Sequence, residues 1–283
     1  PSASSTDNDK YVVYNYGEKV WYFGSLSRTA WIDRGVRTYP IAAGNSYIYN
    51  HEFGYDDETK ILKNVNLEIN PRQIVGITGK SGCGKSTMAK LIQGLYRPQS
   101  GIVALDNTDL RLLDLSHIRS QVSLVGTESY FFPGTIRENI SRPMPNSSMD
   151  RITWATKKVF AHEEIESFPD AYETFLEENA SNISTGLRQK FAIARALIRN
   201  PRILILDDAI SGFDIDSEIK LYDALPDIAL GRTVIIVSNR LYHLRLCNKV
   251  FVLDKGTIKQ EGSFDNLKDI PGFFSDTFYK QTS

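Results

Sequence analysis

The pattern of apolar and polar residues changes near Ser46. From there, short apolar runs alternate with stretches in which apolar residues recur every three or four positions, a pattern typical of strands alternating with helices. Gln73–Thr78 is a short apolar run and predicts a buried strand. The positions that follow predict the apolar stripe of a helix, with spacing i, i+3, i+4, i+7 over Met88, Leu91, Ile92 and Leu95.

The second half of the chain continues this alternation. Residues 135–200 are predicted to be mostly helical, and three later β-branched and aliphatic runs are typical of buried parallel strands. These runs are Arg202–Leu206, Thr233–Val237 and Val250–Leu253. The pattern predicts an α/β fold with a helical insertion between the first and the later core strands.

The residues before 46 have a different character. Residues 1–10 are small and polar and predict a flexible lead, whereas Tyr11–Gly44 is rich in aromatic residues with alternating runs that favour strands. We therefore expect a lead and small β-rich extension over residues 1–45, and one larger domain over residues 46–283. The aromatics of the extension either pack on that domain or form a surface for a partner.

Composition excludes several classes of protein. With 41% hydrophobic and 24% charged residues among 283, the chain is typical of a folded soluble protein. The formal net charge of −1 gives no reason to expect nucleic-acid binding, and no run approaches the roughly 18 apolar residues of a membrane span. Two cysteines are too few for a disulfide framework and suggest a reducing compartment. Because the chain begins at Pro1 rather than Met, we expect an excised or processed fragment, which leaves room for a membrane domain upstream in the parent.

The segment Gly79–Ser86 reads GKSGCGKS and fits the phosphate-loop pattern between a predicted strand and a predicted helix. Glycines let the backbone wrap around phosphates, toward which its N–H groups and the helix N-terminus point. Lys85 is expected to reach the β- and γ-phosphates and Ser86 to ligate Mg²⁺. The candidate nucleotide-binding residues here are Gly79, Ser81, Gly82, Cys83, Gly84, Lys85, Ser86 and Thr87. The Cys83 thiol is either reactive and protected by ATP, or buried and inert.

Two carboxylates follow the predicted strand that ends in ILILDD. A buried strand that delivers an acid at its carboxyl end supplies the second magnesium contact of a phosphate-loop fold, and we assign this role to Asp207. Asp208 is the candidate for orienting or activating the attacking water. The alternative for Asp208 is a helix-capping or surface carboxylate.

Between these motifs lie ISTGL (residues 183–187) and RQKFAIARALIRNP. Here the sequence resembles the ATP-binding cassette (ABC) of ABC transporters, whose signature is LSGGQ followed by RQR-IAIARAL and the carboxylate-bearing strand. The resemblance runs from about Ser46 to Lys280, with FFPGTIRENI (residues 131–140) similar to exporter-type cassettes and SGFD (residues 211–214) to the family's D-loop. It implies a RecA-like phosphate-loop core, an antiparallel β subdomain and a helical subdomain over about residues 135–187.

The resemblance also implies residue roles and partners. Tyr55 corresponds to the aromatic that stacks on adenine, and Glu178 to an acidic residue that faces the membrane domain. Two cassettes, identical or different, pair head to tail, so that Ser184 and Gly186 of one signature close over ATP on the other chain. The implied ligands are ATP and Mg²⁺. The implied partner is a transmembrane domain, which places the chain at the cytoplasmic face of a membrane.

Several positions depart from the family pattern. Thr127 lies where the family has the Q-loop glutamine, and Asp208 replaces a catalytic glutamate, which moves the carboxylate back by about 1.5 Å. Asn239 occupies the position of the switch histidine, and His243 lies too far along the chain to be its equivalent. In the signature, Thr185 replaces a glycine and Leu187 a glutamine. The departures predict that binding is retained and hydrolysis is weak.

Three hypotheses follow. The first is the energy-coupling domain of an exporter, with slow hydrolysis or a role as the weak half of an asymmetric pair. The second is a module that uses ATP to hold a partner cassette without hydrolysing it. The third, a soluble cassette of DNA repair or translation, fits less well because the sequence has neither a long heptad insertion nor zinc-type cysteine pairs.

Overall fold

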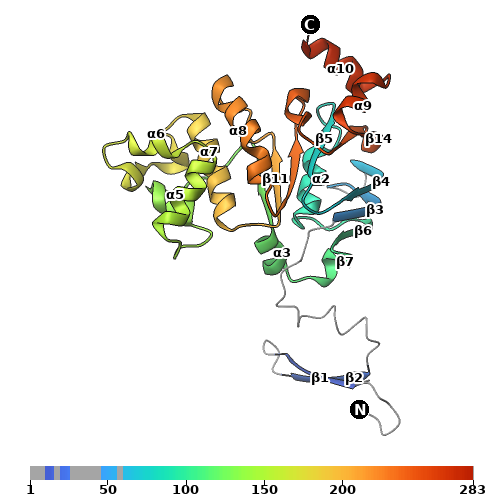
Figure 1. The fold of residues 1–283 in the computed structure, drawn as a ribbon. Helices are drawn as coiled ribbons and strands as arrows, with labels where there is room; N and C mark the ends of the chain where they lie inside the picture. Colours follow the sequence, from blue (N-terminus) through green and yellow to red (C-terminus); the bar gives the residue numbers. More distant parts are fainter. Residues whose placement is uncertain (1–9, 16–19, 26–45, 56–59, 283) are drawn as a thin grey trace.

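The computed structural model describes residues 10–15, 20–25, 46–55 and 60–282 (Figure 1). The polar lead at residues 1–9 and most of the aromatic segment lie outside the described residues. Within that segment, strands β1 (Lys10–Asn15) and β2 (Val20–Ser25) pair antiparallel, with Lys10 opposite Ser25.

A six-stranded sheet forms the centre of the larger domain, in the order β14-β13-β5-β12-β11-β8. The five strands from β13 to β8 are parallel, and β14 is antiparallel to β13. The strands are β5 (Ile74–Gly79), β8 (Val122–Val125), β11 (Ile203–Asp207), β12 (Thr233–Val237), β13 (Lys249–Asp254) and β14 (Thr257–Gly262). The three later apolar runs of the sequence therefore form strands of one parallel sheet, as predicted.

A second, antiparallel sheet has the order β4-β3-β6-β7. Its strands are β3 (Ser46–Phe53), β4 (Leu62–Ile69), β6 (Ser100–Leu105) and β7 (Thr108–Asp109). Strand β4 alternates buried and exposed residues over much of its length, as expected for a strand with one face on the core. The two sheets match the predicted combination of a parallel core and an antiparallel β part.

The first helix lies on the same side of the central sheet as the antiparallel strands, and the two C-terminal helices lie at its β14 end, whereas the helices between residues 149 and 228 lie on the far side from those strands (Figure 1). A short two-stranded pairing of β9 (Gly134–Thr135) with β10 (Phe175–Leu176) lies among them. The helices are α2 (Lys85–Ile92), α3 (Leu115–Gln121), α4 (Ile136–Ser141), α5 (Met149–Lys158), α6 (His162–Glu166), α7 (Thr185–Ile198), α8 (Ile215–Ile228), α9 (Phe264–Asp269) and α10 (Phe273–Thr282). The predicted boundary at residue 187 falls inside α7.

The central sheet is covered on both faces. Along β11, Leu204 and Leu206 belong to the core cluster that includes the helices α4 to α8, whereas Ile203 and Ile205 belong to the cluster beneath α2 and the antiparallel sheet. Alternating side chains thus enter two cores, which explains why the strand is apolar throughout.

One predicted position was wrong: Leu95 lies beyond the end of α2 and is 52% exposed. The helix ends at Ile92, followed by Gly94 with φ +73°.

The parallel register brings four chain segments to one edge of the sheet. Val125 pairs with Leu206, Asp207 with Val237, and Val237 with Ile77. The segments that leave these strand ends are the glycine-rich loop, the two carboxylates, and the stretches containing Thr127 and Asn239. In an open α/β sheet, this carboxyl edge is where ligands bind. Among the described residues, no helix is long and apolar enough to cross a membrane.

Candidate nucleotide-binding site

The loop between β5 and α2 is held in shape by its own lysine. Lys85 is 7% exposed, and its Nζ donates to the backbone oxygens of Gly79 at 2.9 Å and Lys80 at 3.0 Å. An ammonium group is thus fixed inside the curve of the loop. A charge in this position suits the β- and γ-phosphates of a nucleotide.

Glycine is required in this loop for two different reasons. At Gly79, φ is +147° and a Cβ would lie 2.0 Å from the carbonyl oxygen of Leu253, so any side chain would collide with the next strand. At Gly82, φ is +76° and a Cβ would meet nothing within 4 Å. The backbone there borders open space in a conformation that L residues rarely adopt, which leaves room for a phosphate to approach the N–H groups.

Helix α2 begins at Lys85 with Gly84 as its N-cap, and no side chain caps its first turn. The first N–H groups of a helix lack intrahelical partners, and the helix dipole favours negative charge there. Most helices of this chain are capped instead, for example α8 by Asp214 and α5 by Ser148. The uncapped end of α2 is therefore a suitable anion site.

Cys83 is buried in this loop at 6% exposure, with its Sγ 4.0 Å from Lys85 Nζ. Burial raises the pKa of the thiol, and the nearby lysine opposes this only in part. Since the thiolate is the reactive form, these observations favour the inert thiol over the reactive one.

Ser86 and Asp207 form a pair suited to a magnesium ion. Asp207 is 9% exposed at the end of β11, and burial raises the pKa of its carboxyl, an effect that a hydrogen bond from Ser86 offsets only in part. Its Oδ1 is buried and has no hydrogen-bond partner among the described residues. A buried oxygen without a partner is costly, and a cation beside the Ser86 hydroxyl would satisfy it. The residues present therefore fit Mg²⁺.

Asp208 lies next to this pair in an unusual backbone conformation. Its φ is +48°, its N–H donates to the Val237 oxygen at 2.9 Å, and its side chain is half-buried. The helix-capping alternative is wrong, because the helix that follows, α8, is capped by Asp214. Left-handed backbone outside glycine is uncommon and is found often at functional sites.

The two other predicted catalytic positions are exposed at the same edge. Thr127 follows β8 by two residues, and its carbonyl oxygen lies 3.5 Å from Gln189 Nε2 on α7. Asn239 follows β12 by two residues, and its carbonyl oxygen accepts from Gln281 Nε2 of α10 at 3.0 Å. The sheet thus brings Lys85, Asp207, Thr127 and Asn239 to one edge.

Tyr55 lies beside the first turn of α2. Its ring is 50% exposed, and its hydroxyl is 3.2 Å from Thr87 Oγ1. The Tyr96 ring packs edge-on against it with ring centroids 5.2 Å apart. A half-exposed ring next to the phosphate loop is available for stacking on a flat base.

The predicted signature residues lie at the start of α7. Ser184 is the N-cap, and its Oγ accepts from the N–H of Leu187 at 3.1 Å. At Gly186, a Cβ would lie 3.1 Å from the Gly212 oxygen. Leu187 is 4% exposed and belongs to the core rather than to the surface. Among the described residues, no hydrogen bond joins Ser184 or Gly186 to the phosphate loop within this one chain.

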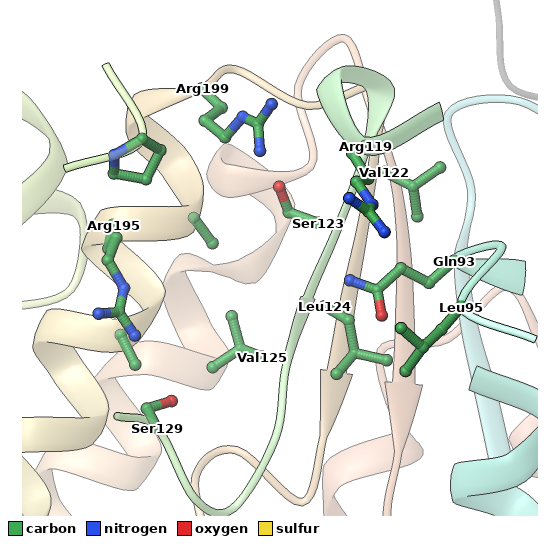
Figure 2. A pocket seen from close by; sticks show the side chains of 13 residues that line it. Gln93, Leu95, Arg119, Val122, Ser123, Leu124, Val125, Ser129, Arg195 and Arg199 are labelled. Carbon is green, nitrogen blue, oxygen red and sulfur yellow. The ribbon is translucent and has the colours of Figure 1, made fainter. Parts of the chain in front are cut away.

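A groove opens on the side of the sheet where β8 meets α7 (Figure 2). Its volume is about 260 Å³, and its walls carry three guanidinium groups, of Arg119, Arg195 and Arg199. Arg195 donates to the Tyr130 oxygen at 2.8 Å, and burial lowers the pKa of its guanidinium, with the positive charge of Arg142 adding to that effect. None of the three groove arginines forms an ion pair with a described residue. This groove leaves no periodic signal in the sequence, because it is assembled from separate elements.

Comparisons with known proteins agree with this geometry. The family model described as ABC transporter matches residues 62–211. Among curated proteins, the leukotoxin translocation ATP-binding protein LktB of Pasteurella haemolytica-like sp. (strain 5943B) is 39% identical over 235 residues, 83% of this chain and 33% of that protein. LktB of Mannheimia glucosida matches to the same extent. The chain thus spans about a third of the length of these relatives.

A solved structure of a bacterial Atm1-family ABC exporter with ATP bound superposes with a TM-score of 0.83 at 29% identity, covering 88% of this chain and 44% of that one. This similarity includes the parallel core, the antiparallel sheet and the helical part together. Because the family model matches more than half of the sequence and the fold agrees, the chain belongs to the ABC transporter family as an ATP-binding domain of the exporter type.

Proposed function

We propose that this chain binds Mg-ATP and uses it to close a head-to-tail pair of cassettes that drives or gates export through a membrane domain, with weak intrinsic hydrolysis. The observation that carries the proposal is a contrast at the sheet edge between complete residues for phosphate and magnesium binding and altered residues at the candidate catalytic positions. The phosphate loop is complete, and Asp207 offers an unpartnered buried oxygen beside Ser86. When bound, Mg²⁺ would neutralise phosphate charge between these two residues.

Weak hydrolysis follows from the residues around the γ-phosphate position. Asp208 carries its carboxylate about 1.5 Å short of a glutamate, and a shift of about 1 Å can cost about a hundredfold in rate. Asn239 has an amide that does not titrate near neutral pH, so it does not act as an acid or base. Thr127 has a hydroxyl where the family pattern has a longer amide.

The incomplete site calls for a second cassette. Ser184 and Gly186 begin helix α7, whose N-terminus suits a phosphate, yet they make no hydrogen bond to this chain's own loop among the described residues. A head-to-tail partner, identical or different, would present its α7 to the ATP held here. Two such interfaces would enclose two nucleotides.

The groove of Arg119, Arg195 and Arg199 is the proposed docking site for the membrane domain. Three guanidinium groups that form no ion pair with the described part of the chain favour a partner segment that carries carboxylates, and arginine suits bidentate pairing with them. Glu178 is linked to the groove through Tyr130: its carboxylate accepts from the Tyr130 hydroxyl at 3.3 Å, and the Tyr130 backbone oxygen accepts from Arg195 at 2.8 Å. Docking there would hold the chain at the cytoplasmic face of a membrane.

A second candidate is a module that binds ATP only to dimerise. The exposed amide of Asn239 and the absence of a glutamate at position 208 favour it. Calorimetric titration with Mg-ATP tests both candidates at the binding step: we expect binding that weakens in Asp207→Asn when Mg²⁺ is present and changes little in EDTA. Equal affinities of the wild type and Asp207→Asn with magnesium would contradict the metal role. Phosphate release then separates the two candidates.

A further inference from the structure

Next to Asn239, the side chains of Ser238, His243 and Glu218 form a ring of hydrogen bonds that closes on Arg240, through both its backbone N–H and its guanidinium group. The N–H of Arg240 donates to Ser238 Oγ at 3.1 Å, Ser238 Oγ lies 2.9 Å from His243 Nδ1, and His243 Nε2 lies 2.5 Å from Glu218 Oε1. The other oxygen of Glu218 accepts from Arg240 Nη1 at 2.7 Å. Arg240 thus closes the ring through two of its groups. In the sequence, Asn239 lies between Ser238 and Arg240, which both belong to the ring.

The chemistry of the ring fixes the direction of every bond. Burial lowers the pKa of the His243 imidazole despite its bond to Glu218, so the ring nitrogen pair carries one proton at neutral pH. A carboxylate only accepts, so that proton is on Nε2, and Nδ1 must accept from the Ser238 hydroxyl. His243 is 4% exposed and stacked on Tyr222 with ring centroids 4.3 Å apart, so the imidazole has little freedom to turn.

The ring lies close to Asp208, the candidate for orienting the attacking water. Ser238 and His243 line a small cavity of about 30 Å³ together with Asp208. Glu218 lies in the first turn of α8, which Asp214 caps. A second anchor comes from α10, where the side chain of Gln281 bonds the oxygen of Asn239 at 3.0 Å and the N–H of Leu241 at 2.9 Å. The backbone on both sides of Asn239 is thus tied to the interior.

We propose that His243 is a positioning residue that acts through Ser238 and Glu218 to fix residue 239 toward the nucleotide. The imidazole is buried at 4% exposure, whereas Asn239, two residues after the carboxyl end of β12, is exposed, so we assign contact with the nucleotide to residue 239 and not to His243. The inference rests on the proposed function of the site. The sequence alone did not indicate this role, because His243 lies too far along the chain to be the equivalent of the switch histidine at position 239.

The test uses a restored site, in which Asp208→Glu and Asn239→His are combined. In that background, Ser238→Ala removes the hydroxyl that joins Arg240 to His243, and Ser238→Thr keeps a hydroxyl. We expect Ser238→Ala to lower kcat about tenfold while KM for ATP stays within about twofold, since the phosphate loop is untouched. Ser238→Thr should recover most of the rate. Ser275→Ala is the matched control, because it deletes another buried serine hydroxyl far from the ring in sequence.

Hydrogen exchange of the peptide that spans residues 238–243 gives a readout independent of turnover. Ser238→Ala should raise its exchange rate several-fold in the otherwise wild-type chain, and Ser238→Thr and Ser275→Ala should not. Unchanged exchange in Ser238→Ala would overturn the positioning role, whatever the rates. A restored site that is no faster than the wild type even with a partner cassette whose signature is intact, together with faster exchange in Ser238→Ala, would instead contradict the assignment of weak hydrolysis to positions 208 and 239 and support the ring.

Discussion

The phosphate loop and the opposite edge of the site differ in how their residues are held. In the loop, Lys85 is buried and bonded to two backbone oxygens, and Gly79 is packed against β13. Across the sheet edge, Thr127 and Asn239 are exposed and are fixed through their backbone oxygens. Under the proposed function, nucleotide binding would depend on an internally rigid loop, whereas turnover would depend on side chains that have room to vary. We therefore expect binding and hydrolysis to be separable by mutation.

The largest expected effect concerns the rigid side. Lys85→Ala should weaken Mg-ATP binding roughly 100-fold or more. The ammonium group is expected to contact the β- and γ-phosphates, and the loss of these two charge-assisted contacts would cost about 1.5–3 kcal/mol each. Lys80→Ala is the matched control, since Lys80 is in the same loop but exposed. Calorimetry measures both affinities. Equal affinity of Lys85→Ala and the wild type would rule out the phosphate-loop assignment.

A second prediction concerns the variable side. Asp208→Glu combined with Asn239→His should raise ATP turnover about tenfold to a hundredfold, more than either change alone, because both act on the same water and γ-phosphate. The gain should be larger with a partner cassette whose signature is intact. In a homodimer every site also receives the ISTGL segment. Strictly independent effects of the two substitutions would show that they do not share a step.

These two sides also differed in how well the sequence predicted them. The strand ends and the loop were predictable because apolar runs and glycines are local signals, and the register then placed Asp207 beside Val237. The ring around His243 was not, because it joins residues 25 positions apart on α8 and after β12. The arginine groove likewise depends on α3, β8 and α7 meeting in space. Contacts between distant segments leave no periodic trace in one sequence.

A smaller effect concerns the adenine side. Tyr55→Ala should weaken ATP binding several-fold, as expected for a stacking contribution of about 0.5–1.5 kcal/mol, and Tyr55→Trp should preserve it. Its neighbour Tyr96 offers the control, because Tyr96→Ala keeps the Tyr55 ring. If Tyr55→Ala binds as well as the wild type, another aromatic stacks on the base.

The smallest effect is a pH dependence of stability. The folded pKa of His243 is lowered by burial, against bonding and charge from Glu218, so below about pH 6.5 the unfolded chain binds a proton that the native chain does not. The free energy of unfolding should fall as the pH falls through that window, by at most about 1.4 kcal/mol per pH unit. Denaturant unfolding of the wild type and His243→Gln between about pH 5.5 and about pH 7.5, the range in which histidine ordinarily titrates, checks this pH dependence. Equal slopes would show that His243 is not buried neutral.

The proposed retention of ATP binding with weakened hydrolysis is tested most directly on one preparation of the wild-type chain with Mg²⁺, by measuring the ATP dissociation constant and the steady-state phosphate release rate. The proposed function predicts clear saturable binding with a turnover far below the rate of about 10 per second that is typical of enzymes. Tight binding with turnover of tens per second by the chain alone would contradict the claim that binding has been retained while hydrolysis has been weakened.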